Sequence, residues 1–164
     1  MRPTKRAVTT LVQNPADRFA TPRLAAGALF VQDESVLLVR KTYGNRWDIP
    51  GGYVDRGESP ASACEREVQE ELGLNRETRR LLVHDWAPNN GEGDKILYVF
   101  DCGELAEDEH RIRLDGVEID GTEWVAVGDL GEFVIPRLEY RLTQAYHAYI
   151  SGVTLYLEHG RLRF

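Results

Sequence analysis

The sequence predicts an α/β protein in which a β-sheet is sandwiched between helices. Two observations lead to this prediction. Short runs rich in aliphatic and aromatic residues recur along the chain between turn-forming residues, as strands do. Two segments, one following Ser59 and one beginning at Pro136, instead place their apolar residues at helical spacing. Strands interspersed with helices are typical of this fold class, and 164 residues are enough for one domain with a sizeable core.

Composition argues against several classes of function. No apolar run approaches the roughly 20 residues that a membrane span needs, and the N-terminal residues show no apolar signal core. We therefore expect a cytoplasmic protein with no membrane partner. A net charge of −7 argues against nucleic-acid binding, which normally needs a basic face. A small polyanionic substrate stays compatible with this charge if metal ions mediate the contact.

The N-terminal part is expected to contain an arm followed by strands. Residues 1–22 lack periodicity and are interrupted by two prolines, which indicates an irregular arm with room for one short helix. The single domain then runs from residue 23 to residue 164. Residues 24–41 predict two strands around a polar turn, and the following loop predicts a short strand at 47–49.

The first helix is predicted from its two ends and from its apolar spacing. Ser59 can cap the N-terminus, Pro60 suits the first helical position and Gly73 suits the stop. The apolar seam that should pack on the sheet consists of Ala61, Cys64, Val68 and Leu72. The other cysteine is Cys102. Two cysteines fit a reducing compartment and favour two buried thiols, with a disulfide left as the alternative.

The second half of the chain predicts three further strands and a closing helix. The strands are expected at 80–87, 95–105 and 118–127, and the stretch 106–117 between the last two is charged and rich in turn-forming residues. A helix begins at Pro136 and stops at Gly152. This tyrosine-rich C-terminal helical tail is expected to pack on the domain or to form a homodimer contact.

Three glutamates of the first helix raise a question of chemistry. Glu67, Glu70 and Glu71 occupy an arc of roughly 100° around the helix, next to the apolar seam, so the helix is expected to have a core face and a separate carboxylate face. Two unit charges ~4 Å apart repel by about 4 kcal/mol at an effective dielectric constant near 20. The cluster is therefore either a solvated surface on which the side chains splay apart, or a site gathered by a cation. Carboxylates beside the carbonyls of the Gly51–Gly52 turn would suit Mg²⁺, which prefers oxygen ligands.

The residues around this cluster resemble the signature of a known family. Gly52 is followed after five residues by Glu58, and after seven more by the run Arg66-Glu67-Val68-Gln69-Glu70-Glu71-Leu72-Gly73-Leu74. This 23-residue stretch resembles a complete Nudix box. The lead-in Trp47-Asp48-Ile49-Pro50-Gly51 agrees with the same resemblance.

The resemblance implies an α/β/α sandwich with a central mixed sheet. It also implies Mg²⁺- or Mn²⁺-dependent hydrolysis of a nucleoside diphosphate linked to another moiety. Carried over by position, Glu67, Glu70 and Glu71 are the expected metal ligands, joined by a main-chain carbonyl of Gly51 or Gly52.

Three further residues receive roles from the resemblance. Glu58 and Arg66 are expected to brace the loop against the helix, with Arg66 pointing away from the metal ions. Glu118 lies six residues before Trp124, where similar proteins often place an acidic ligand or general base. A glutamate at the surface end of a strand is an equally weighted alternative for Glu118.

The box leaves the substrate open. The compact length favours a MutT-like enzyme that cleaves a nucleoside or deoxynucleoside triphosphate to the monophosphate and pyrophosphate. The alternatives are an ADP-ribose or nucleoside-diphosphate-sugar pyrophosphatase and, less favoured because all box carboxylates are present, a non-catalytic nucleotide sensor on the same fold.

Overall fold

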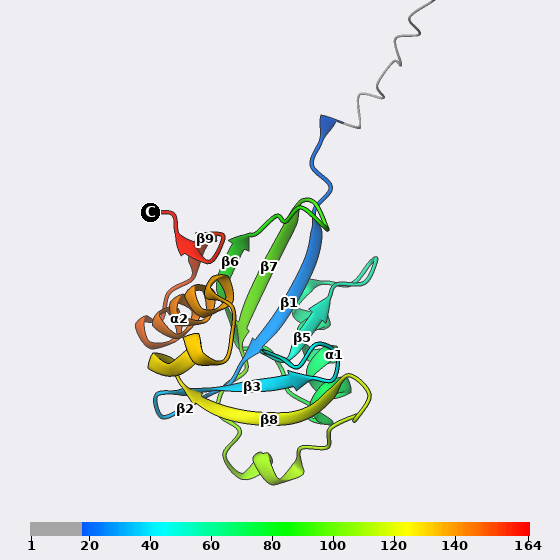
Figure 1. The fold of residues 1–164 in the computed structure, drawn as a ribbon, viewed down its shortest axis with the longest axis vertical. Coiled ribbons are helices and arrows are strands. Elements are labelled where there is room, and N and C mark those ends of the chain that lie inside the picture. The colour runs from blue at the N-terminus through cyan, green and yellow to red at the C-terminus, as the bar shows by residue number, and fades with distance from the viewer. Residues whose placement is uncertain (1–17) are drawn as a thin grey trace, which may run out of the picture.

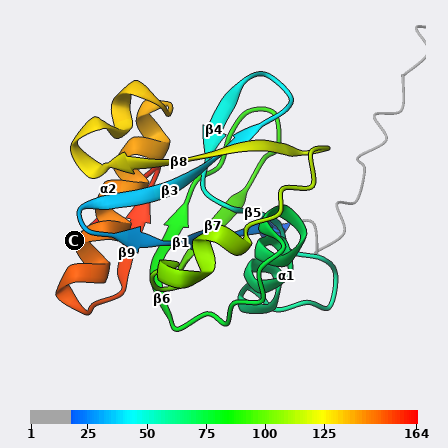
Figure 2. The same cartoon turned by 90° about the horizontal axis from the view of Figure 1, so that it is seen from below.

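The computed structural model describes residues 18–164. Most of the expected N-terminal arm, residues 1–17, lies outside the described residues. The described chain forms two β-sheets with one long helix on either side, so that the strands lie between the helices (Figures 1 and 2). The expectation of an α/β/α sandwich with a central mixed sheet is confirmed.

The larger sheet has six strands in the order β10-β9-β6-β7-β1-β5. Their bounds are β1 Arg23–Leu29, β5 Gly51–Tyr53, β6 Arg80–Trp86, β7 Lys95–Asp101, β9 Leu155–Glu158 and β10 Arg161–Leu162. The pairs β1–β7 and β6–β9 are parallel and the others are antiparallel, so the sheet is mixed.

The smaller sheet is antiparallel and packs beside the first. It contains β2 Val31–Gln32, β3 Ser35–Lys41, β4 Arg46–Asp48 and β8 Ile119–Ala126, with β3 pairing all three others. Short 3₁₀ helices, Ala106–Arg111 and Val127–Glu132, precede and follow β8. The first of them occupies the stretch that the sequence marked only as charged and rich in turns.

The two long helices begin and end as the sequence predicts. Helix α1 spans Pro60–Leu72, and the Ser59 hydroxyl accepts a hydrogen bond from the Ser62 N–H at 3.1 Å. Helix α2 spans Pro136–Ser151. Each helix stops at a glycine in the left-handed conformation, Gly73 with φ 69° and Gly152 with φ 72°. Glycine adopts this conformation without the steric cost of a side chain.

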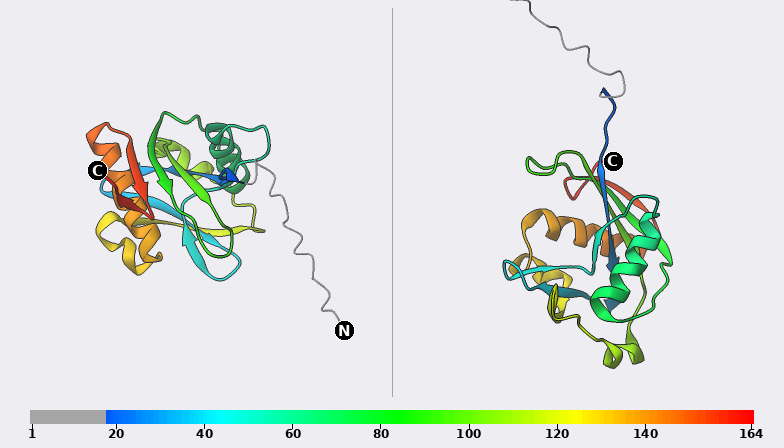
Figure 3. Two further views of the ribbon diagram at one scale, coloured as in Figure 1. Left: turned by 90° about the horizontal axis from the view of Figure 1, so that it is seen from above. Right: turned by 90° about the vertical axis from the view of Figure 1, so that its right-hand side faces the viewer.

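Each helix covers its own apolar core. Under α1, the expected seam contributes the fully buried Cys64, Val68 and Leu72, while Ala61 is half-buried against the same cluster. The Sγ atoms of Cys64 and Cys102 lie 3.9 Å apart, and both thiols are free and buried. The other core lies under α2, which covers the strands on the side away from α1 (Figure 3). It takes apolar residues of the same sheets. Together the two cores fix α1 and α2 on opposite sides of the strands.

The C-terminal tail differs from the sequence prediction. It does not end as a helix, because β9 and β10 follow α2, and β9 pairs in parallel with β6. A strand of four residues offers too few positions for its period to be recognised in the sequence. Leu157 is nevertheless fully buried, which shows that β9 belongs to the core.

The strand expected at 95–105 is also shorter than predicted. It ends at Asp101, whose carboxylate accepts a hydrogen bond from the Gly103 N–H at 2.8 Å and turns the chain. In the described part of the chain, no helix has the length and apolar character needed to cross a bilayer.

Candidate active site

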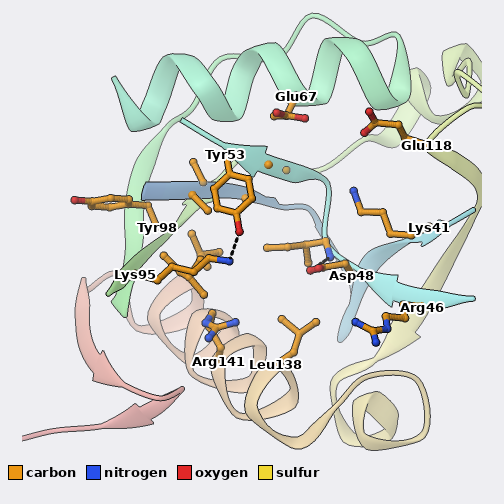
Figure 4. Close-up of a pocket in the computed structure, with 18 of the residues that line it drawn as sticks. Lys41, Arg46, Asp48, Tyr53, Glu67, Lys95, Tyr98, Glu118, Leu138 and Arg141 are labelled. Atoms are coloured by element: carbon orange, nitrogen blue, oxygen red, sulfur yellow. Dashed lines mark hydrogen bonds between the residues drawn. The ribbon is translucent and has the colours of Figure 1, made fainter. Parts of the chain in front are cut away.

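A cavity of about 620 Å³ opens between α1 on one side and α2 on the other (Figure 4). Its floor is formed by β1 and the β4–β5 segment, and its α1 side carries Glu67 and Glu118. Cationic side chains that line it include Lys41, Arg46 and Arg141. The cavity therefore brings carboxylates and cations together around one space.

Glu67 lies directly against the backbone of Gly52. A Cβ atom added to Gly52 would meet the Glu67 Oε1 atom at 2.3 Å, which is far closer than real Cβ contacts allow. Any larger residue at position 52 would push this carboxylate away from the turn. The glycine is thus required for the approach of a helix carboxylate to the β5 main chain.

Gly51 is required for two other reasons. Its φ of 152° and a Cβ that would lie 2.3 Å from the Ala26 carbonyl oxygen both exclude a side chain. Its N–H donates to Glu71 Oε2 at 3.0 Å. The glycine pair therefore brings the same turn into contact with two of the three glutamates.

Glu71 is buried, although the sequence placed it on a carboxylate face separate from the core face. Its side chain is 2% exposed, and the other carboxylate oxygen accepts a hydrogen bond from Lys41 Nζ. Burial raises the pKa of Glu71 to about 7, against the opposing effects of the Lys41 charge and the Gly51 N–H. The separation of the two faces was wrong, because residue 41 of β3 supplies a cation beneath the helix.

The other two glutamates are in more polar surroundings. The Glu67 side chain is 13% exposed, and the Glu70 side chain is 54% exposed. The three carboxylates thus range from buried to solvated. They therefore differ in how easily a metal ion could replace the Lys41 or Arg66 side chain that each one contacts.

Arg66 makes the expected contact with the loop that precedes α1. Its Nε and Nη2 donate to the two oxygens of Glu58, each at 3.0 Å, and Nη2 also donates to the Tyr53 carbonyl oxygen at 3.0 Å. This parallel pair of hydrogen bonds fixes both groups in one plane. The hydrogen bonds from Arg66 lower the pKa of Glu58, and the hydrogen bond from the Asp55 N–H acts in the same direction.

The expected direction of Arg66 was wrong in one respect. Its Nη1 donates to Glu67 Oε1 at 2.8 Å and to Glu70 Oε2 at 3.1 Å, so it also faces the helix carboxylates. Glu70 lies one turn further along α1, and the guanidinium is long enough to reach both sides. Arg66 therefore links the loop, Glu67 and Glu70 in one network.

Glu118 directly precedes β8, is exposed, and lines the cavity. Figure 4 shows its side chain on the same side as Glu67 and above Lys41. The loop before β8 is held by Asp115 Oδ1, which accepts the N–H of Glu118 at 3.1 Å. The Glu118 carbonyl oxygen in turn accepts the Thr42 N–H at 2.9 Å. Of the sequence-predicted site residues, the cavity is lined by Gly51, Gly52, Arg66, Glu67 and Glu118. The other three, Glu58, Glu70 and Glu71, are joined to this group by hydrogen bonds with Arg66 or Gly51.

Several cavity residues were not found from the sequence. They are Lys41, Asp48, Tyr53, Lys95 and Arg141. Arg141 lies in an otherwise apolar helix face, and its charge at a core position was the only available signal. The others lie in strands. The alternation of side chains along a strand predicts which residues share a face of the sheet, but it does not predict which residues of other segments they contact.

The oxygen atoms at this site suit a hard divalent cation. Carboxylates and glycine carbonyls are the donors that Mg²⁺ and Mn²⁺ prefer. Within residues 18–164, no three Asp, Glu, His or Cys side chains converge in an arrangement that could hold a metal ion. Lys41 and Arg66 instead neutralise the carboxylates. A bound metal ion would therefore take the place of these positively charged side chains. The close approach of Glu67 to Gly52 places a carboxylate beside a main-chain turn, and these are two of the kinds of oxygen donor that such a cation prefers.

A comparison with protein families agrees with this arrangement. Residues 21–148 match the family model of the NUDIX domain. The chain belongs to the Nudix family. Nudix hydrolases cleave pyrophosphate bonds and generally use divalent metal ions.

Curated relatives of this Nudix protein carry several different names. A putative 8-oxo-dGTP diphosphatase of Bacillus subtilis is 31% identical over 106 residues, covering 65% of this chain and 67% of that protein. The human diphosphoinositol polyphosphate phosphohydrolase 3-alpha is 34% identical over 99 residues, covering 60% of this chain and 58% of that protein. The matches to the first curated relatives span between 31% and 67% of their length.

Solved structures show the same Nudix fold. A MutT Nudix hydrolase from Burkholderia pseudomallei aligns with a TM-score of 0.60 and 27% identity, over 76% of this chain and 97% of that one. A MutT protein from Methanosarcina mazei aligns with a TM-score of 0.65 and 24% identity, over 82% and 98% of the two chains. The second similarity concerns the fold alone.

Proposed function

We propose that this Nudix protein hydrolyses a nucleoside triphosphate or deoxynucleoside triphosphate to the monophosphate and pyrophosphate. One observation carries the proposal: the turn at Gly51 and Gly52 contacts Glu71 and Glu67 of the box beside a cavity of about 620 Å³, and Arg66 joins Glu70 to Glu67. This volume falls within the range of roughly 300–1,000 Å³ that is common for small-molecule sites. The name of the Bacillus subtilis relative supports the same substrate class.

The proposed metal site uses the acidic side of the cavity. Glu67, Glu70 and Glu71 hold a divalent cation, with the carbonyl oxygen of Gly51 or Gly52. When bound, such a cation neutralises the phosphates and lowers the pKa of water. Lys41 and Arg66, which now pair with these carboxylates, remain beside them as positive charges. They help to offset the repulsion between the carboxylates and an anionic substrate.

Glu118 is proposed as the general base. It lies at the cavity wall beside the carboxylates, and no other acidic side chain of the β8 loop lines the described cavity. Its carboxylate takes the proton of the attacking water while the water oxygen forms a bond to phosphorus. The bridging P–O bond breaks and its electrons leave with the pyrophosphate. A positioned base of this kind contributes roughly 10²- to 10⁴-fold to the rate.

The test is a substrate screen with Mg²⁺ present. The panel contains ribonucleoside and deoxyribonucleoside triphosphates, ADP-ribose and a UDP-sugar, and the measurement is the release of monophosphate and pyrophosphate. We expect the triphosphates to be cleaved with the highest kcat/KM. Preference for ADP-ribose or the sugar nucleotide would replace the triphosphate proposal, and binding without cleavage of any compound would favour a sensor.

The network around Arg66 leads to a separate prediction. Lys cannot reproduce the two parallel hydrogen bonds to Glu58, so Arg66→Lys should displace the loop and the carboxylates. A misplacement near 1 Å can cost about 10²-fold in rate. Glu58→Gln should cost less, because Arg66 keeps its contacts with Glu67 and Glu70.

A double-mutant cycle on kcat/KM at saturating Mg²⁺ measures this coupling. The double variant should be little worse than Arg66→Lys alone, since both changes break the same contact. Arg56→Lys, a matched change at an exposed loop residue, serves as the control. Fully additive losses would show that Arg66 and Glu58 act separately.

A further inference from the structure

The α2 side of the cavity contains a charged residue that the proposed catalysis does not use. Arg141 projects from α2, and its side chain is 8% exposed. Its Nε donates to Asp85 Oδ2 at 2.6 Å, and the other Asp85 oxygen accepts the Gly160 N–H at 3.1 Å. The guanidinium is therefore held from behind by a fully buried carboxylate.

The same guanidinium has an unused donor. Arg141 Nη2 is buried and has no hydrogen-bond partner among residues 18–164. Figure 4 shows the end of this side chain at the cavity, beside Lys95 and Leu138. A buried donor without a partner costs free energy, so native proteins rarely keep one without a reason. A ligand in the cavity would give this guanidinium an acceptor after a small shift of the side chain.

Asp48, at the end of β4, supplies the complementary group. Its Oδ1 accepts the Ile49 N–H at 2.8 Å, and its Oδ2 accepts no hydrogen bond from the described residues. Burial raises the pKa of Asp48, and the positive charges of Lys41 and Arg141 oppose this effect. The α2 side of the cavity thus presents an acceptor and a donor to the same ligand.

The charges at this side are mostly balanced within the protein. Lys95 Nζ donates to Glu92 Oε2 at 3.0 Å and to the Tyr53 hydroxyl at 2.9 Å, and Asp85 balances Arg141. The remaining wall includes the rings of Tyr53 and Tyr98 and the aliphatic Leu138. Such a wall suits a flat heterocycle with polar edges better than a second group of phosphates.

We propose that Asp48 and Arg141 recognise the base of the nucleotide and favour guanine over adenine. The inference rests on the proposed function for the placement of the phosphates beside α1. Guanine offers a carbonyl oxygen, which accepts from Arg141, next to a ring N–H, which donates to Asp48. Adenine offers an amino group and a ring nitrogen with one lone pair, and so leaves part of the guanidinium unpaired.

The test measures binding without hydrolysis. GMP and AMP are titrated into the EDTA-treated protein by calorimetry, and GMP should bind about tenfold more tightly, since one good base contact discriminates by a factor of this order. Asp48→Asn replaces an acceptor with a donor. It should weaken GMP binding by about tenfold and change AMP binding little. Asp33→Asn, the same substitution at an exposed turn outside the cavity, should change neither.

A second variant covers the case in which Asp48→Asn does not fold. Arg141→Lys keeps the charge beside Asp85 but removes the forked donors, and it should also abolish the preference for GMP. Equal losses for GMP and AMP in either variant would overturn the proposal, as would tighter binding of inositol hexakisphosphate than of GMP. Selective GMP binding by a protein that cleaves no triphosphate would overturn the proposed function and leave base recognition standing.

Discussion

EDTA should reduce hydrolysis to the background rate, and added Mg²⁺ or Mn²⁺ should restore it. In the described structure Lys41 and Arg66 are the only cations in hydrogen-bond contact with Glu67, Glu70 and Glu71, and neither can activate water. A bound divalent ion stabilises the transition state by several kcal/mol, which corresponds to a loss on the order of 10³-fold when it is removed. The measurement is pyrophosphate release before and after the ion is added back.

The dependence of activity on Mg²⁺ concentration should also change with pH. Since the pKa of Glu71 is raised to about 7, this carboxyl is largely protonated below that pH and must lose its proton to bind a cation. The Mg²⁺ concentration that gives half-maximal activity should therefore fall as the pH rises from about 6 to about 8. Ca²⁺ serves as the control ion, because it has the same charge as Mg²⁺ but prefers more ligands at longer distances. Full activity in excess EDTA would exclude a metal-dependent reaction.

Glu70→Gln and Glu71→Gln should both abolish most turnover but differ in stability. Each removes a charged oxygen ligand, and we expect kcat to fall by at least about 10²-fold in either variant. A carboxylate face that is separate from the core, as the sequence predicts, would lose little stability from either change. The structure changes this for Glu71, because its substitution leaves the Lys41 ammonium, 10% exposed, without an opposite charge.

The stability difference is measurable by thermal unfolding of the metal-free protein. Removing one partner of a buried ion pair costs about 3–5 kcal/mol, and each kcal/mol lowers the Tm of a chain of this size by roughly 2–4 °C. Glu70→Gln should unfold near the wild-type temperature, because Glu70 is half exposed. Glu77→Gln, at an exposed position after α1, is the control for both activity and stability. Equal Tm values for the two box variants would mean that the Lys41 contact contributes no stability.

The sequence predicted the parts of the molecule that depend on local spacing. Ser59, Gly73 and Gly152 mark the ends of the two long helices, and these residues act on backbone groups within a few positions. The contact of Glu58 with Arg66, eight residues apart, was implied by the resemblance to the Nudix box and is also local in sequence. In each case the physical cause lies within one turn or loop, so a short window of sequence contains it.

The parts that were missed depend on contacts between distant segments. Lys41 and Glu71 are 30 residues apart, and Asp85 and Arg141 are 56 apart. Their pairing follows from how α1 and α2 dock on opposite sides of the sheets, which periodicity does not determine. The burial of Glu71 has the same origin, since only the folded position of β3 places a cation beneath it.

The short strands after α2 have a consequence for how specificity could diverge among relatives. Gly160, which joins β9 to β10, donates its N–H to the carboxylate that supports Arg141. This glycine comes so close to α2 that a Cβ atom would lie 2.5 Å from the Arg137 carbonyl oxygen. The region shared with the family model ends at residue 148, whereas α1 lies well inside it. Substitutions in the terminal hairpin can therefore move Arg141 at one end of the cavity while α1 and its carboxylates at the other end stay in place.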